Sequence, residues 1–130
     1  MRGALYEKIA LVLLALIIII GGITLIVHFN NRKVAEDKID QYIADYGIPK
    51  KEIKSEDYPM FNSLSAPKGF FKTVYVKNET DKNNYYIFHY DPSNKKVTFS
   101  GIVDGNEVSI NDKLVEKLRY QPSDKVLNQK

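Results

Sequence analysis

The chain has 130 residues, of which 44% are hydrophobic and 27% are charged, with a formal net charge of +3 and no cysteine. Without cysteine, the sequence offers no disulfide, no thiol nucleophile and no thiolate metal ligand. Basic and acidic residues are interspersed along the chain, whereas nucleic-acid-binding proteins usually carry a clustered basic excess, so we expect no nucleic-acid partner.

The first element is an apolar stretch over residues 9–29, which contains no charged residue and whose only polar side chains are Thr24 and His28. A helix of this length rises about 31 Å, close to the thickness of the hydrocarbon core of a bilayer. The stretch therefore predicts a single transmembrane helix, with the lipid bilayer as its partner, preceded by a short N-terminal tail over residues 1–8.

A cleaved signal peptide is the alternative interpretation of this stretch. Arg2 and Lys8 resemble a basic leader, and Gly21-Gly22 resembles a small-residue cleavage site. The apolar run continues to Val27, which favours a retained helix. Basic residues flank both ends, so charge does not fix the orientation. The short tail before the helix favours a signal anchor, with the following domain outside the cytoplasm.

Residues 31–120 predict one small domain that begins with an amphipathic helix over residues 31–46. Its apolar side chains share a broad stripe, while its acidic side chains fall largely elsewhere. The stripe comprises Val34, Ile39, Tyr42, Ile43 and Tyr46; the acidic residues are Glu36, Asp37, Asp40 and Asp45. Gly47 suits the left-handed cap and Pro49 prevents continuation. Asn30-Asn31 is a candidate break between this helix and the apolar one.

The strands follow as an antiparallel meander. We expect an irregular edge strand over residues 53–60, a loop over 62–69, and strands over 70–77, 84–90 and 96–103. Gly101 predicts a bulge in the last of these strands. Asp104-Gly105 is a strong hairpin signal, so the chain should return through residues 107–110.

The C-terminal region predicts a short helix and a tail. Asn111 is a candidate N-cap for a helix over residues 112–120, and residues 121–130 predict a frayed end. The fold class expected is thus α+β: an N-terminal transmembrane helix, then one amphipathic helix packed on an antiparallel meander of about four strands, and a short C-terminal helix.

Catalytic and metal-binding motifs are absent from the sequence. His28 and His89 are too few for a common zinc site, and no nucleophile elbow, phosphate loop or zinc-protease motif occurs. The residues before Asp104 do not supply calcium ligands. We therefore expect no enzyme activity, no cofactor, no metal and no small-molecule substrate.

The feature most open to a functional interpretation is a set of aromatic residues on neighbouring strands. One sheet face must pack under the amphipathic helix, yet both alternating sets of residues 85–90 are apolar or aromatic, although a strand buried on one face should show polar residues on the other. Either the C-terminal helix covers the second face through Leu114, Val115 and Leu118, or a partner binds it. The candidate partner-binding aromatic face comprises Tyr75, Tyr85, Tyr86, Phe88 and Tyr90, with Phe99 on the adjacent strand.

Several segments carry a resemblance to a known group of proteins. They are Tyr46-Gly-Ile-Pro49, Lys51-Glu-Ile-Lys54, Tyr85-Tyr-Ile-Phe-His-Tyr90, Asn94-Lys-Lys-Val97 and Leu118-Arg-Tyr-Gln-Pro122. On these segments the chain resembles small Gram-positive single-pass proteins with a membrane-anchored domain of unknown function. The resemblance implies a C-terminus outside the cell and supplies no activity. In element order alone the chain is also similar to PepSY-type domains, which implies a regulator of a peptidase.

The functional expectation that follows is a membrane-anchored extracytoplasmic interaction domain, which binds or modulates a partner protein of the cell envelope. The alternative is a PepSY-like regulator or inhibitor of a cell-envelope peptidase. An enzyme would require two acidic side chains that converge in a cleft.

Overall fold

The computed structural model describes residues 2–61 and 68–129, so most of the loop expected over residues 62–69 lies outside the described residues. The chain divides into two units, residues 1–33 and residues 34–130. Helix α1 (Arg2–Tyr46) contributes residues to both units and continues through Asn30 and Asn31, so the candidate break is not present.

The first unit consists of the N-terminal part of α1. Its apolar side chains are exposed; Ile17, for example, is 67% exposed. The hydroxyl of Thr24 donates a hydrogen bond to the carbonyl oxygen of Ile20, 2.8 Å away, so this polar side chain is satisfied within the helix, as a lipid environment requires. Among the described residues, α1 is the one helix that is long and apolar enough to cross a membrane.

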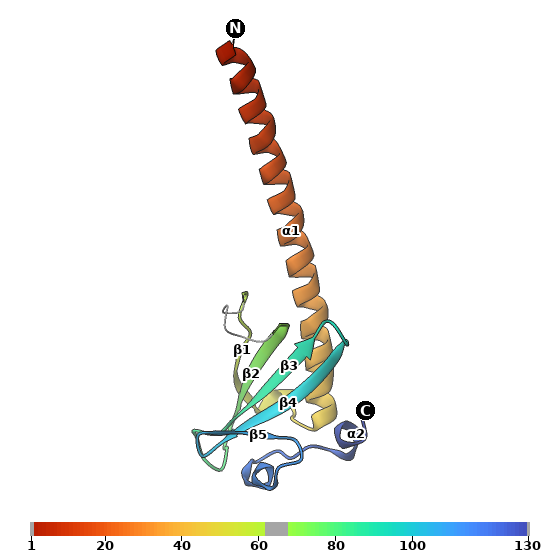
Figure 1. Ribbon diagram of the computed structural model, residues 1–130. Helices are drawn as coiled ribbons and strands as arrows, with labels where there is room; N and C mark the ends of the chain where they lie inside the picture. The colour runs from red at the N-terminus through yellow and green to blue at the C-terminus, as the bar shows by residue number, and fades with distance from the viewer. Residues whose placement is uncertain (1, 62–67, 130) are drawn as a thin grey trace. The chain divides into compact units, whose positions relative to one another are not determined.

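The second unit is an α+β domain in which the C-terminal part of α1 packs on one face of a sheet (Figure 1). The strands are β1 (Ile53–Asp57), β2 (Phe70–Val76), β3 (Tyr85–Asp91), β4 (Lys96–Val103) and β5 (Asn106–Ser109), in spatial order β1-β2-β3-β4-β5. Every neighbouring pair is antiparallel. The predicted meander is confirmed, with five strands rather than about four.

Helix α1 ends where the sequence predicts. Gly47 has φ +111° and Ile48 donates its backbone N–H to the carbonyl oxygen of Ile43, 3.3 Å away, which is the bond that closes a left-handed cap. Ile48 folds back into the core and is 3% exposed. The buried stripe of this part of α1 differs from the prediction at one position, because Ala35 is buried whereas Val34 is exposed.

The predicted bulge at Gly101 is wrong. Gly101 pairs in continuous register with Tyr86 and Val108. A Cβ atom at this position would lie 3.0 Å from the Leu118 side chain and 3.3 Å from that of Val108. A side chain at this position would require these neighbours to shift by a few tenths of an ångström, so Gly101 allows the C-terminal segment to pack closely on β4. The register shift in the sheet lies instead between Ile53 and Ser55 of β1.

The C-terminal region corrects two further predictions. Asp112, not Asn111, caps the short 3-10 helix η2 (Lys113–Lys117), because its carboxylate accepts the N–H of Leu114 at 2.9 Å. Residues 121–129 are not a frayed tail: they include helix α2 (Asp124–Leu127), whose Val126 is 4% exposed. A second 3-10 helix, η1 (Lys50–Glu52), connects α1 to β1.

Candidate functional site

The sheet has two faces of different composition. One face contributes to the core beneath α1, and the other, which we call the outer face, points away from that core. Register places the outer face in three rows across the three central strands. It comprises Phe71, Thr73, Tyr75, Tyr85, Ile87, His89, Thr98, Ser100 and Ile102. None of these nine residues is lysine, arginine, aspartate or glutamate, in a chain of which 27% is charged.

Two ring pairs organise the outer face. The rings of Tyr75 and Tyr85 lie 5.1 Å apart between centroids, and the ring of Phe71 stacks on that of His89 at 4.3 Å. His89 Nε2 donates a hydrogen bond to the carbonyl oxygen of Lys68, 2.8 Å away. All nine side chains except Thr98, which is exposed, are half-buried. Both are cross-strand pairs, and aromatic pairs of this kind stabilise a sheet.

Charged residues lie at the rim of the outer face. Asp57 of β1 is paired with Thr73, and Glu107 of β5 is paired with Ile102. Lys96 begins β4 opposite Asp91, at the end of β3. The arrangement is an uncharged centre surrounded by a charged border, which is the composition typical of protein–protein interfaces.

The five residues of the predicted aromatic face lie on two different faces of the sheet. Tyr75 and Tyr85 lie on the outer face, half-buried. Tyr86, Phe88 and Tyr90 lie on the opposite side of the same strand and belong to the core, with exposed fractions of 5% or less. The three buried residues are therefore not available to a partner, because the C-terminal part of α1 packs over them.

The prediction that Leu114, Val115 and Leu118 cover the second face is wrong. Leu118 lies against Gly101 on the core side of the sheet, and all three residues pack with the same core cluster as α1. Within residues 2–61 and 68–129, helix η2 therefore extends the core instead of covering the outer face.

A polar network joins the turn between β2 and β3 to the C-terminal segment. The Tyr86 hydroxyl donates to Glu79 Oε2 at 2.6 Å and accepts the N–H of Tyr120 at 3.0 Å. The second oxygen of Glu79 accepts the N–H of Arg119 at 2.7 Å. Burial, together with the hydrogen bond to Glu79, raises the pKa of the Tyr86 hydroxyl far above its usual range, so this hydroxyl stays protonated and acts as a tie.

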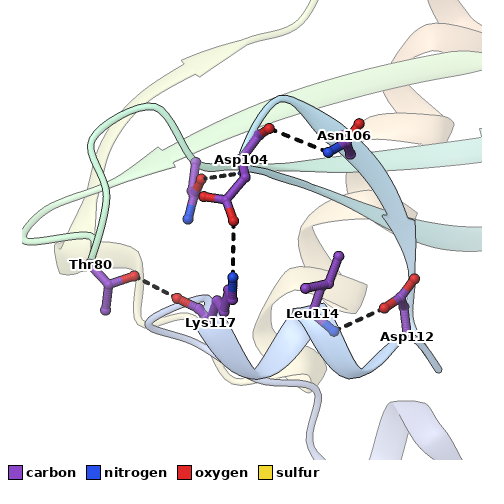
Figure 2. A network of polar contacts seen from close by, with 7 residues as sticks. Thr80, Asp104, Asn106, Asp112, Leu114 and Lys117 are labelled. Atoms are coloured by element: carbon purple, nitrogen blue, oxygen red, sulfur yellow. Dashed lines mark hydrogen bonds and ion pairs between the residues drawn. The ribbon is translucent and has the colours of Figure 1, made fainter.

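Figure 2 shows that the network continues across the end of the sheet. Thr80 donates its hydroxyl to the carbonyl oxygen of Lys117, and the Lys117 ammonium pairs with Asp104 at 3.1 Å. The N–H of Asp104 in turn donates to Asn84 Oδ1 at 3.2 Å. These bonds hold helix η2 against the hairpin that joins β4 to β5.

A buried lysine is the site residue that the sequence interpretation missed. Lys72 points from β2 into the core side and is 2% exposed. Its Nζ lies 2.7 Å from Asp40, 3.2 Å from Glu36 and 3.4 Å from Glu56. Burial alone would lower the pKa of Lys72, but hydrogen bonds to Asp40 and Glu36 and the charges of Asp40 and Glu56 outweigh it and raise that pKa.

This lysine cluster is a structural tie between α1, β1 and β2. It lines a groove of about 310 Å³. The three carboxylates share one ammonium, so the cluster carries a net negative charge, and all three are held in place by Lys72. Within the part of the chain that the structure describes, no group of acidic or histidine side chains is placed to hold a metal ion.

No protein-family model, no curated protein and no solved structure matches this chain. The two resemblances drawn from the sequence therefore stay predictions, and the functional conclusion rests on the geometry of the domain itself.

Proposed function

We propose that this protein is a non-enzymatic interaction domain held at the cell membrane by the apolar part of α1, with residues 34–130 outside the cytoplasm. In this proposal the outer face binds a partner protein of the cell envelope. The bilayer is the partner of residues 9–29, whose exposed apolar side chains suit lipid.

One observation carries the binding proposal: the nine residues of the outer face include no charged residue. On a solvent-facing sheet, alternate positions are normally polar or charged. Interface centres are instead depleted of lysine, aspartate and glutamate and enriched in tyrosine and phenylalanine. Tyr75, Tyr85 and Phe71 match that composition, so the occupant we infer is a protein surface whose own centre is uncharged.

A photo-crosslinking residue in place of Ile87, at the centre of the outer face, tests this proposal in the full chain within its own membrane. We expect an adduct with one envelope protein. Adding Tyr85→Lys should reduce that adduct by about tenfold or more, because a charge would be buried without a partner at the interface. The matched control is Asn111→Lys, which adds the same charge at an exposed position outside the outer face.

Two results would contradict the proposal. An adduct that forms equally well with Tyr85→Lys would mean that the face is not the contact surface. Adducts found only between two copies of this chain would replace the envelope partner with self-association.

A further inference from the structure

Strand β4 is longer than β5, which pairs with the edge of β4 that faces away from β3. Strand β5 pairs with Ser100, Gly101, Ile102 and Val103, whereas residues 96–99 pair with β3 alone. On the side away from β3, the backbone of residues 97–99 forms no hydrogen bond with any other described segment. Such an open edge can accept one further strand. At about 3.3 Å per residue, its length suits about four residues of an extended chain.

A groove of about 500 Å³ lies against this open edge. Strand β4 contributes Val97 and Thr98 to its lining, and α1 contributes Tyr42. Tyr42 is 7% exposed. The groove therefore combines an unpaired strand edge with a floor that includes Tyr42 and Val97.

The charge of the groove is positive. Lys38, Lys95 and Lys96 line it, are exposed, and form no ion pair with any described residue. Among the described residues that line the groove, the one carboxylate is that of Asp45, which is paired with Lys125 at 3.0 Å and accepts a hydrogen bond from Gln41. Hydrogen bonding to Lys125 lowers the pKa of Asp45, so that carboxylate stays ionised and occupied. Three ammonium groups remain for a ligand.

The groove at the other end of the sheet differs in this respect. There the edge strand β1 lies beside Lys72, whose charge is fully matched by Glu36, Asp40 and Glu56. An acidic ligand would meet three carboxylates at that cluster. At β4, by contrast, an open backbone edge lies beside three lysines that form no ion pair with any described residue.

We propose that the groove between α1 and β4 binds an extended acidic peptide segment of a partner protein, which adds as a strand along residues 97–99. The strand edge recognises the peptide backbone and the lysines recognise its carboxylates. A lipid headgroup or free phosphate would use only the lysines, so the unpaired backbone favours a peptide. The groove adjoins the outer face at Thr98, and the proposal holds whether or not the outer face binds a protein.

The lysines have a competing role that the test must separate from binding. Lysine on an exposed strand edge also prevents unwanted strand pairing. If Lys95 and Lys96 serve only that purpose, the edge should reject every extended peptide, whatever its charge.

The test uses the full chain in a mild detergent and fluorescence anisotropy of labelled, end-blocked peptides. A peptide that alternates glutamate and valine is compared with one that alternates glutamine and valine, and with the acidic peptide methylated on alternate backbone nitrogens. We expect the acidic peptide to bind about tenfold or more tightly than either comparison peptide. Hydrogen exchange at residues 97–99 should slow when it binds.

The variant Lys38→Gln/Lys96→Gln should weaken binding of the acidic peptide by about tenfold, whereas Lys113→Gln, an exposed lysine outside the groove, should leave it unchanged. Equal binding of the methylated peptide would reduce the interaction to non-specific charge attraction and overturn the proposal. Failure of the acidic peptide to bind at about 1 mM would overturn it in favour of edge protection.

Discussion

Replacing Phe88 with alanine is expected to lower the free energy of unfolding of the domain by about 3–5 kcal/mol, the usual cost of removing a buried aromatic side chain. The Phe88 side chain is fully buried. Its ring centroid lies 5.8 Å from those of Tyr42 and Tyr46 and 5.6 Å from that of Phe99, so the ring joins α1 to the sheet. Urea unfolding of the full chain in mild detergent, followed by the near-ultraviolet circular dichroism of tyrosine, measures this loss.

The neighbouring variant Ile87→Ala is the matched control. Ile87 lies on the outer face and is half-buried, so its truncation should cost about 1 kcal/mol, mainly through reduced strand propensity. Equal losses for the two variants would show that both faces are covered, which would contradict the sidedness on which the binding proposal depends.

The second large effect is expected at the Lys72 cluster. The triple variant Glu36→Gln/Asp40→Asn/Glu56→Gln should lose about 3–5 kcal/mol at neutral pH, because it leaves a buried ammonium without a compensating charge. Adding Lys72→Met to the triple variant should recover most of this loss, because a thioether of similar volume needs no charged partner. A triple variant as stable as the natural chain would show that Lys72 reaches solvent, contrary to its 2% exposure.

The free energy of unfolding should depend on pH in opposite directions in the natural chain and in the triple variant. In the natural chain the pKa of Lys72 is raised above 10.5, so its contribution to stability is complete below pH 10.5 and is lost as pH rises through the raised pKa. In the triple variant burial acts alone and lowers that pKa. The triple variant should therefore gain stability as pH rises from neutral toward 10.5. Unfolding curves measured across this range distinguish the two cases.

Local signals account for the elements that the sequence predicted well. The end of α1 needs only a left-handed residue and a stop, which Gly47 and Pro49 supply within four positions of Tyr46. The hairpin at Asp104 and Gly105 is equally local, since both residues adopt positive φ. Runs of aromatic and β-branched residues between polar turns located the strands for the same reason.

The errors arose where distant segments meet. A glycine within a strand pattern, such as Gly101, indicates a bulge. In the structure Leu118 packs on Gly101 instead. Helix α2 is too short to show periodicity, and its position depends on the N–H of Ser123 donating to the carbonyl oxygen of Tyr46. No local pattern indicates either contact.

Odd-numbered and even-numbered residues of one strand lie on opposite faces of the sheet. The residues of the two faces could therefore have been told apart from the sequence alone. Lys72 shares its parity with Val74 and Val76, which places it on the inward side of β2. Tyr85 and Tyr86 differ in parity, so they cannot belong to one binding face. Parity alone does not show which face of the sheet α1 covers, because that depends on the register between β2, β3 and β4.

Topology in intact cells tests the proposed membrane-anchored, extracytoplasmic domain most directly. The chain has no cysteine, so Lys82→Cys, in the exposed turn between β2 and β3, and Gly3→Cys, near the N-terminal end of α1, each give a unique probe. With a membrane-impermeant maleimide, we expect Lys82→Cys to react in intact cells and Gly3→Cys to react only after lysis, with the full-length protein in the membrane fraction. Reaction of Lys82→Cys only after lysis would place the domain in the cytoplasm and contradict the proposed envelope partner.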